Sequence, residues 1–193
     1  IKRAKEFWYI DHGYFGKGTP HRFDGYYRIV YNSIIHDTNG DFPSDRLDRF
    51  NIKFKDWRKN GNKIVMVPPS IPMGKFVGVP HEEWIDFTKQ ELEKHTDREI
   101  ILCQKQKGKK SNLMELLKDA WVLITDHSNC QVDALVNGVP VISTSPMRKI
   151  GSLADVENPV MDRSFLKNLA YRQWTINEIN SGQAWRELND FPQ

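Results

Sequence analysis

The chain has 193 residues, of which 39% are hydrophobic and 27% charged, and its formal net charge is +3. This length and composition support a folded core, and they exclude an intrinsically disordered segment and a miniprotein held by disulfides or zinc. Two cysteines are too few for a thiolate metal site, and the small positive charge is compatible with an anionic ligand without requiring nucleic acid.

Residues 1–62 are rich in aromatic residues and show no long regular period. Two short strands are expected here, Phe7–Ile10 and Tyr26–Tyr31, with glycine turns over residues 13–18 between them. We therefore expect an irregular N-terminal extension that precedes the main fold.

Apolar runs of strand length alternate with helical segments in residues 63–146. Strands that read as continuous apolar runs are typical of a parallel sheet covered on both faces. This order predicts an α/β fold with a doubly wound, Rossmann-like parallel sheet in three αβα layers. The expected strands are Lys63–Val67, Glu99–Cys103, Trp121–Thr125 and Val139–Ser143, and the expected helices are His81–His95, Ser111–Ala120 and Ser128–Asn137.

Residues 147–193 are mostly polar, and apolar residues recur at helical spacing between Ser164 and Ser181. We expect a helical C-terminal tail that packs on the sheet. Gly138 follows the helix Ser128–Asn137 at the position where a left-handed residue commonly ends a helix.

The turn from Asp126 to Asn129 follows the third strand of the expected sheet. In doubly wound sheets, ligands bind at the carboxyl ends of the strands. Ser128 and Asn129 can donate to a phosphate there, beside the free backbone N–H groups of the next helix, and Asp133 can accept from sugar hydroxyls. Helix capping and interaction with the helix dipole explain the same residue types, so a purely structural role stays an alternative.

This stretch resembles the nucleotide-sugar half of glycosyltransferases of the B fold, particularly the capsule-polysaccharide and sialyltransferase-like kind. The family pattern is a strand, a Ser-rich turn, an acidic residue followed by Ala-Leu, and then Gly-x-Pro-Val. The matching residues are Thr125, Ser128, Asn129, Asp133-Ala134-Leu135 and Gly138-Val139-Pro140-Val141. The resemblance covers about residues 63–146, and the flanking segments look like those of uncharacterised glycosyltransferase-like proteins common in phages and bacteria.

The resemblance implies roles for individual residues. The turn with His127, Ser128 and Asn129 would bind the donor phosphates, and Asp133 would meet the ribose, where the family more often has Glu. A basic residue at the end of the second strand would contact donor phosphate, which here is Lys105. Lys107, Lys109 and Lys110 are expected to form a solvated face, and contact with an anionic acceptor is the alternative.

The loop after the first strand is expected to cross the mouth of the same crevice. Pro68 and Pro69 disfavour a helix, so Ser70 and the chain through Lys75 are interpreted as loop. A rigid surface loop without ligand contact is the alternative.

Transfer of a sugar to a hydroxyl requires a base that takes the acceptor proton. His12, in the N-terminal segment, is the candidate base, and Asp11 is the second candidate or its orienting partner. If His12 lies away from the Ser128 turn, the candidates become Asp126 or His127 at the crevice itself. A turn in which Asp11 caps and His12 packs is the alternative. No structural metal is expected, because His36-Asp37 and Asp126-His127 lack a third ligand at a recognisable spacing.

The expected function is therefore a metal-independent glycosyltransferase with no cofactor beyond its nucleotide-sugar donor. Its acceptor would be a polysaccharide, a lipid-linked glycan or another hydroxyl compound. Two alternatives stay open: a noncatalytic nucleotide-sugar-binding module, and a phage enzyme that glycosylates modified DNA and so has a nucleic acid as partner. No apolar run approaches the roughly 18 residues that cross a bilayer and no signal-peptide pattern opens the chain, so we expect no membrane span and a cytoplasmic location in a bacterial or phage-infected cell.

Overall fold

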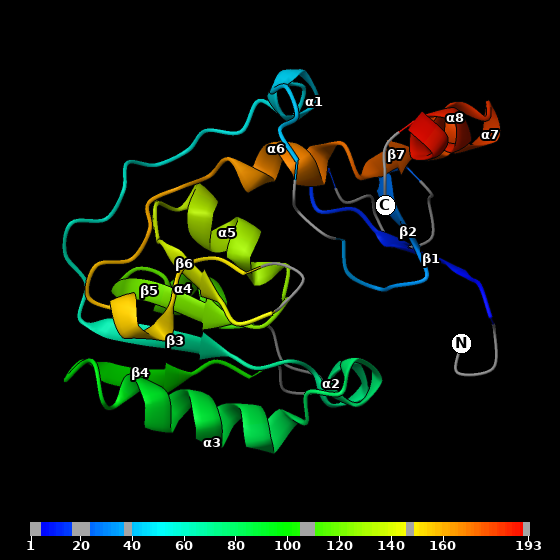
Figure 1. Ribbon diagram of the computed structural model, residues 1–193. Helices are drawn as coiled ribbons and strands as arrows, with labels where there is room; N and C mark the ends of the chain where they lie inside the picture. The colour runs from blue at the N-terminus through cyan, green and yellow to red at the C-terminus, as the bar shows by residue number, and fades with distance from the viewer. Residues whose placement is uncertain (1–4, 17–23, 37–39, 105–110, 146–148, 191–193) are drawn as a thin grey trace. The chain divides into compact units, whose positions relative to one another are not determined.

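The computed structural model describes residues 5–16, 24–36, 40–104, 111–145 and 149–190. The chain divides into two compact units (Figure 1). The first unit combines Ile1–Ile52 with Arg163–Gln193, and the second unit is Lys53–Asp162. This division differs from the expected one into residues 1–62, 63–146 and 147–193, because the C-terminal segment contributes a strand to the sheet of the first unit.

The second unit contains a parallel four-stranded sheet with the order β4-β3-β5-β6. The fold is therefore α/β, as expected. Its strands are β3 (Lys63–Val67), β4 (Glu99–Leu102), β5 (Ala120–Thr125) and β6 (Val141–Ser143), and its helices are α2 (Ile71–Val77), α3 (His81–Leu92), α4 (Leu113–Leu116), α5 (Cys130–Val136) and the 3₁₀ helix η1 (Leu153–Asp155).

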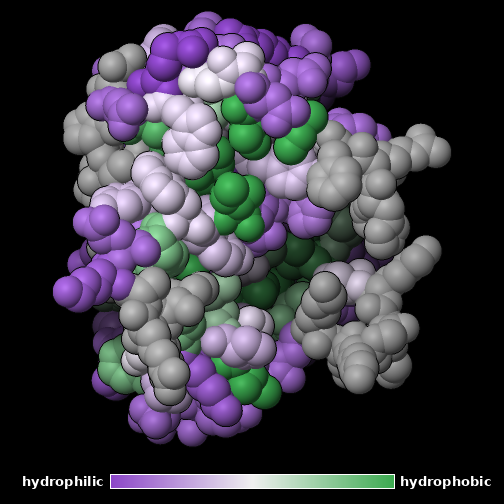
Figure 2. Space-filling model, turned by 90° about the vertical axis from the view of Figure 1, so that its right-hand side faces the viewer, coloured by the Kyte–Doolittle hydropathy of each residue, from purple (hydrophilic) through white to green (hydrophobic). Residues whose placement is uncertain are grey.

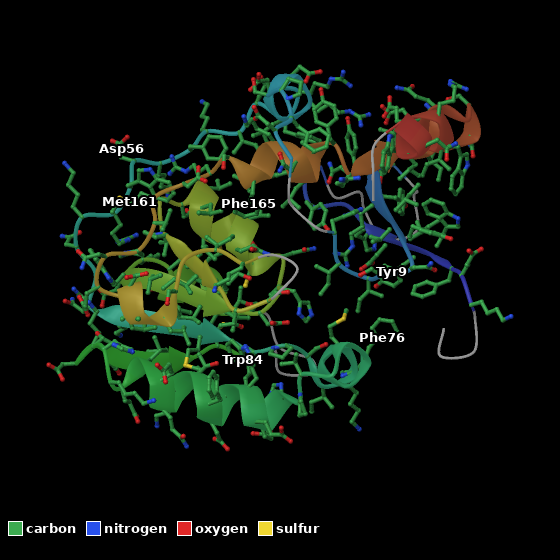
Figure 3. The ribbon with its side chains drawn as sticks, viewed as in Figure 1. Tyr9, Asp56, Phe76, Trp84, Met161 and Phe165 are labelled. Carbon is green, nitrogen blue, oxygen red and sulfur yellow. The ribbon has the colours of Figure 1, made fainter. Side chains whose placement is uncertain are left out.

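Helices cover both faces of this sheet, and Figure 1 shows α3 and α5 on opposite sides of it. Trp84 and Leu92 of α3 pack against one face, and Trp84 lies between α3 and the sheet in Figure 3. Helix α5 contacts β5 and β6. The strand residues in the α3 core are Ile64, Met66, Val122, Ile124 and Ile142, all almost fully buried.

The loop expected after β3 is a helix, which corrects the sequence-based interpretation. Helix α2 begins directly after Ser70, whose hydroxyl oxygen accepts a hydrogen bond from the backbone N–H of Met73 at 3.4 Å. Pro72 stands in the first turn, where a missing N–H costs nothing. Prolines 68 and 69 therefore precede the helix rather than prevent it.

The first unit contains an antiparallel sheet with the order β1-β2-β7. A core of Ile29, Trp174, Ala184 and Leu188 joins this sheet to the C-terminal helices. The strands are β1 (Trp8–His12), β2 (Tyr26–Tyr31) and β7 (Gln173–Thr175), and the helices are α1 (Asp45–Asp48), α6 (Phe165–Ala170), α7 (Ile176–Asn180) and α8 (Gln183–Asp190).

The helix expected over Ser164–Ser181 is interrupted by β7, so the prediction of a single tail helix was wrong. Thr175 has an extended backbone and forms a capping box with Glu178 that starts α7 anew. Trp174, which fits the apolar helical spacing of Ser164–Ser181, is instead a buried strand residue opposite Tyr27.

Hydrophobic side chains also reach the surface. Trp8, Ile10 and Trp185 are among the large apolar residues that are exposed. The face seen in Figure 2 intersperses hydrophobic with hydrophilic residues. Within the described part of the chain, no helix combines the length and the apolar character that crossing a bilayer requires.

Candidate functional site at the carboxyl edge of the parallel sheet

The strand order places two loops side by side. From β3 the chain moves to β4 on one side, and it then passes to β5 on the other side of β3. The carboxyl ends of β3 and β5 are therefore the point at which the winding of the sheet reverses, which is where open parallel sheets bind ligands. A hydrogen bond from the Thr125 hydroxyl to the carbonyl oxygen of Val67, 2.8 Å long, joins these two ends.

Ser128 and Asn129 occupy this edge, as expected, but they precede the helix instead of opening it. Helix α5 begins at Cys130, and the Ser128 hydroxyl oxygen accepts from the Cys130 backbone N–H at 3.4 Å. Asn129 makes no side-chain capping bond. Both side chains are half-buried, and Asp133 is exposed on the next turn. Because α5 has only seven residues, side-chain donors matter more at this turn than a helix dipole does.

Asp126 and His127 form a hydrogen-bonded pair at the same turn. The Nδ1–H of His127 donates to Oδ2 of Asp126, and both side chains are more than 90% buried. Thr144, directly after β6, donates to the other carboxylate oxygen at 3.5 Å. Ser143 donates to the Asp126 backbone carbonyl at 2.6 Å, so the carboxylate and its backbone are both held.

The first turns of α3 reach this network from beneath the sheet. The indole N–H of Trp84 donates to the Thr144 hydroxyl at 2.8 Å, which leaves the Thr144 hydroxyl proton for Asp126. One chain of hydrogen bonds therefore runs from α3 through the end of β6 to the turn after β5.

His81 is a second histidine at this edge, and sequence reasoning missed it. Its Nδ1–H donates to the Pro69 carbonyl at 2.6 Å, and its Nε2 lies 3.2 Å from the amide nitrogen of Gln104, just beyond β4. Because a carbonyl can only accept, Nδ1 carries the proton and Nε2 accepts from the Gln104 amide. The signal that was available is its position as the first residue of a predicted helix behind Pro80.

Two further residues of the expected site are Ser70 and Lys105, and the structure describes only Ser70. Ser70 lies at the carboxyl end of β3 and is exposed, but its hydroxyl caps α2. Lys105 lies outside the described residues, so its contact with phosphate stays a prediction.

The first unit holds Asp11 and His12 on β1, and it does not bring their side chains together. Alternation along a strand sends neighbouring side chains to opposite faces. Asp11 binds the Arg28 guanidinium at 2.8 Å and the Tyr9 hydroxyl at 3.1 Å. His12 is exposed, and its ring stacks on Tyr27. The hydrogen bond that Asp11 makes to His12 is with the backbone N–H, at 2.8 Å, and not with the imidazole ring.

The electrostatics of Asp11 fit a structural ion pair. Burial raises the pKa of the Asp11 carboxyl, but hydrogen bonds from Arg28, the His12 backbone and Tyr9, with the charge of Arg28, outweigh it and leave the pKa below its ordinary value. An ionised carboxylate committed to a buried arginine is a poor base. The role of His12 itself stays a prediction.

Cys130 lies beside the candidate site, in the first turn of α5. Burial, chiefly, raises the pKa of its thiol to about 12. A thiol that stays protonated is neither a nucleophile nor a metal ligand near neutral pH. Among the residues with assigned positions, no three His, Cys, Asp or Glu side chains gather as metal ligands would.

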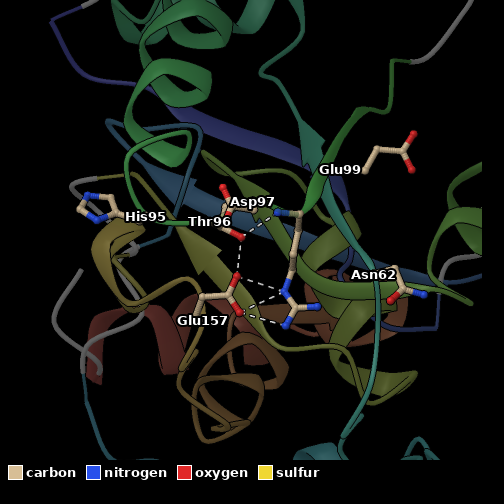
Figure 4. A pocket seen from close by; sticks show the side chains of 7 residues that line it. Asn62, His95, Thr96, Asp97, Glu99 and Glu157 are labelled. Carbon is tan, nitrogen blue, oxygen red and sulfur yellow. Dashed lines mark hydrogen bonds and ion pairs between the residues drawn. The ribbon is translucent and has the colours of Figure 1, made fainter.

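A shallow hollow of about 470 Å³ lies at the opposite, amino edge of the sheet (Figure 4). Arg98 lines this hollow, and its Nε lies 3.1 Å from both carboxylate oxygens of Glu157. The Thr96 hydroxyl also donates to Glu157, and the Arg98 guanidinium lies over the Trp121 ring. Thr96, Arg98 and Glu157 bind one another, so these three side chains tie the segment that holds Glu157 to the start of β4.

Comparison with protein-family models finds no match for this chain, and neither does comparison with curated proteins.

Proposed function

We propose that the protein is a glycosyltransferase that moves a sugar from a nucleotide-sugar donor to an acceptor hydroxyl without a bound metal. In this proposal the second unit is the Rossmann-like, three-layer part of a B-fold enzyme, and the acceptor is a polysaccharide, a lipid-linked glycan or another hydroxyl compound. The reaction takes place in the cytoplasm, the reducing compartment that the cysteine usage favours.

One observation carries the proposal. Ser128 and Asn129 stand at the carboxyl end of β5, where the winding of a doubly wound sheet reverses, with Asp133 one helical turn further on. Short hydroxyl and amide donors at this position suit a phosphate, and a carboxylate at that spacing suits sugar hydroxyls. The glycosyltransferase-like order of residues from Thr125 to Val141 supports the same ligand.

The test is a titration of the whole chain with free nucleotides, sugar nucleotides and inorganic phosphate, followed by calorimetry and by thermal unfolding. We expect one nucleotide class to bind, and at 100 times its Kd the ligand stabilises the protein by about 2.7 kcal/mol. Ser128→Ala should weaken binding by about tenfold or more, as expected for a lost hydrogen bond to a charged group. Ser152→Ala is the matched control, since Ser152 only caps η1.

The outcomes separate the candidate functions. If no nucleotide binds, or if Ser128→Ala binds as tightly as the wild type, the donor site is wrong. Binding without hydrolysis or transfer of the sugar supports the noncatalytic module instead. Binding to DNA that weakens steeply with added salt supports the enzyme that glycosylates DNA.

A further inference from the structure

The histidines of the described residues differ in what holds their rings. His36 is engaged at both nitrogens, by the Tyr14 hydroxyl at 2.9 Å and by the Ile29 carbonyl at 2.9 Å. His95 meets Glu91 through Nε2 at 3.2 Å. His127 donates from Nδ1 to a buried carboxylate, while its Nε2 has no hydrogen-bond partner among the residues that the structure describes.

This arrangement defines the chemistry of His127. Because the Asp126 carboxylate accepts from Nδ1–H, the neutral ring keeps its lone pair on Nε2. When Nε2 takes a proton, the adjacent carboxylate stabilises the imidazolium that forms. A ring with one nitrogen oriented and the other unbound is arranged to accept a proton from a reacting hydroxyl.

Asp126 is itself held in place by hydrogen bonds, and it therefore fixes the orientation of the His127 ring. Its carboxylate accepts from Thr144, Thr144 accepts from Trp84, and Ser143 holds the Asp126 carbonyl. These contacts come from α3 and from the end of β6, and they fix a side chain that is almost fully buried. Thr144 and Trp84 thus act on His127 only through Asp126.

We infer that His127 is the general base of the proposed sugar transfer and that Asp126 is its positioning residue, an assignment that rests on the proposed function. The acceptor oxygen attacks the anomeric carbon while its proton passes to Nε2 of His127. The bond from the anomeric carbon to the phosphate oxygen breaks, and its electron pair stays on the departing nucleoside phosphate. This single displacement inverts the configuration at the anomeric carbon.

The inference moves the base from His12 to His127. The carboxylate next to His12 is bound to Arg28 and does not touch the His12 ring, whereas the carboxylate next to His127 receives a ring N–H. Adjacent residues in a strand point apart, but in the turn after β5 the backbone lets neighbouring side chains meet. That difference in backbone geometry separates two Asp-His pairs that look alike in sequence.

The experiment measures hydrolysis of a bound sugar nucleotide, with water as the acceptor, and needs no knowledge of the natural acceptor. This assignment moves His127 from the phosphate contact that the resemblance implies to the acceptor proton. For His127→Gln we therefore expect kcat to fall by about 10² to 10⁴ while nucleotide affinity changes by less than about threefold. Asp126→Asn should lower kcat and leave KM unchanged. Added imidazole should restore turnover to His127→Ala and not to Asp126→Asn, which a merely structural defect would not reproduce.

His95→Gln is the matched control, because His95 lies at the opposite edge of the sheet, and its kcat should stay within about threefold of wild type. A wild-type rate in His127→Gln with binding retained overturns the inference, and so does a 100-fold loss in His12→Gln. Failure of every sugar nucleotide to bind the wild type contradicts the proposed function itself. Binding without any turnover in the wild type overturns the base and leaves the donor site standing.

A second readout does not depend on turnover. In nitrogen-resolved NMR spectra of the wild type, the neutral form of the His127 ring should carry its proton on Nδ1, in a hydrogen bond, and none on Nε2, and Asp126→Asn should shift the Nδ1–H resonance. A neutral ring protonated on Nε2 would contradict the pairing on which the inference depends.

Discussion

Gly138 and Asp56 are in close backbone contact: a Cβ built on Gly138 would lie 2.0 Å from the carbonyl oxygen of Asp56. Gly138 has a φ of +75°, which confirms the expectation that a left-handed residue ends this helix. The carbonyl of Gly138 also accepts from the Arg58 N–H at 2.8 Å. Residues 55–58 therefore lie very close to the end of α5. This close approach is possible because residue 138 has no side chain.

Gly138→Ala should destabilise the protein by about 2 kcal/mol or more. Part of the loss is the left-handed backbone, which costs a residue with a Cβ roughly 1–2 kcal/mol, and the rest is displacement of the Asp56 backbone. Urea unfolding measures the change in the free energy of unfolding.

Gly78→Ala is the control for this prediction. Gly78 has nearly the same φ, +76°, but beyond its chain neighbours no heavy atom lies within 4 Å of the position a Cβ would take. The free energy of unfolding that Gly78→Ala loses should therefore reflect backbone strain alone and be clearly smaller than the loss in Gly138→Ala. Equal losses for the two variants would show that the contact with Asp56 does not matter.

Glu157→Gln tests the ion pair at the amino edge of the sheet. Burial raises the pKa of Glu157, but hydrogen bonds from Arg98 and Thr96, with the charge of Arg98, bring it below the ordinary 4.5. Such a carboxyl stabilises the fold above pH 4.5, and its contribution is lost as the pH falls through the lower folded-state pKa. We expect Glu157→Gln to be about 1 kcal/mol less stable than the wild type at pH 7, a modest value because the pair is partly exposed. On acidification the variant should lose less stability than the wild type does.

Glu115→Gln is the matched control, since Glu115 pairs with Lys118 on an open helix surface where both side chains are about 70% exposed. Unfolding free energies measured from pH 7 to pH 3 should barely distinguish this variant from the wild type. If Glu157→Gln showed the full acid dependence of the wild type, the shifted pKa of Glu157 would not be what links stability to pH.

The parallel sheet could be predicted from sequence because its strands carry their own signal. Lys63–Val67 matches β3 residue for residue, and Ala120–Thr125 begins one residue before the predicted start. Central strands buried on both faces must be apolar throughout, so the run itself marks the strand. The reversal of winding between β3 and β5 then brought Ser128 and Asn129 to the expected edge.

The C-terminal segment could not be predicted in the same way. Trp174 fits a helical stripe as well as it fits a strand, and only pairing with β2, about 150 residues earlier in the chain, decides between them. Tertiary contacts of this kind outweigh local periodicity over short segments. Helix α2 was missed for a different reason, since prolines before a helix and prolines within it look alike in sequence.

The hydrogen bond between Asp126 and His127 is a part of the candidate site that could not be predicted from the sequence. The two residues were visible as possible metal ligands and as the next candidates for the base after His12, but their pairing depends on Thr144 and on Trp84, 18 and 42 residues away from Asp126. A hydrogen-bond network assembled from three elements leaves no local pattern. The same holds for His81, whose ring is oriented by the carbonyl of Pro69.

Cys130 should resist alkylation in the folded protein. Its pKa of about 12, raised mainly by burial, leaves almost no thiolate at pH 8. Mass spectrometry after treatment with iodoacetamide should find Cys130 unmodified in the native protein and modified in urea. Rapid labelling under native conditions would show that the first turn of α5 opens readily, and the packing around the candidate site would then need revision.

Lys105→Ala should weaken nucleotide binding by roughly 1.5 to 3 kcal/mol, the range for hydrogen bonds to charged groups. The prediction rests on the sequence, since Lys105 follows β4 next to Gln104 and the resemblance implies a phosphate contact there. Unfolding free energy should change little, because a lysine at a ligand site is not part of the core.

Lys109→Ala provides the control from the same basic run. Titrations at fixed salt should show that this variant binds the nucleotide with nearly wild-type affinity, since a solvated lysine adds only a screened, distant charge. Equal losses in the two variants would mean that the basic run attracts the nucleotide as a whole and that Lys105 makes no specific contact.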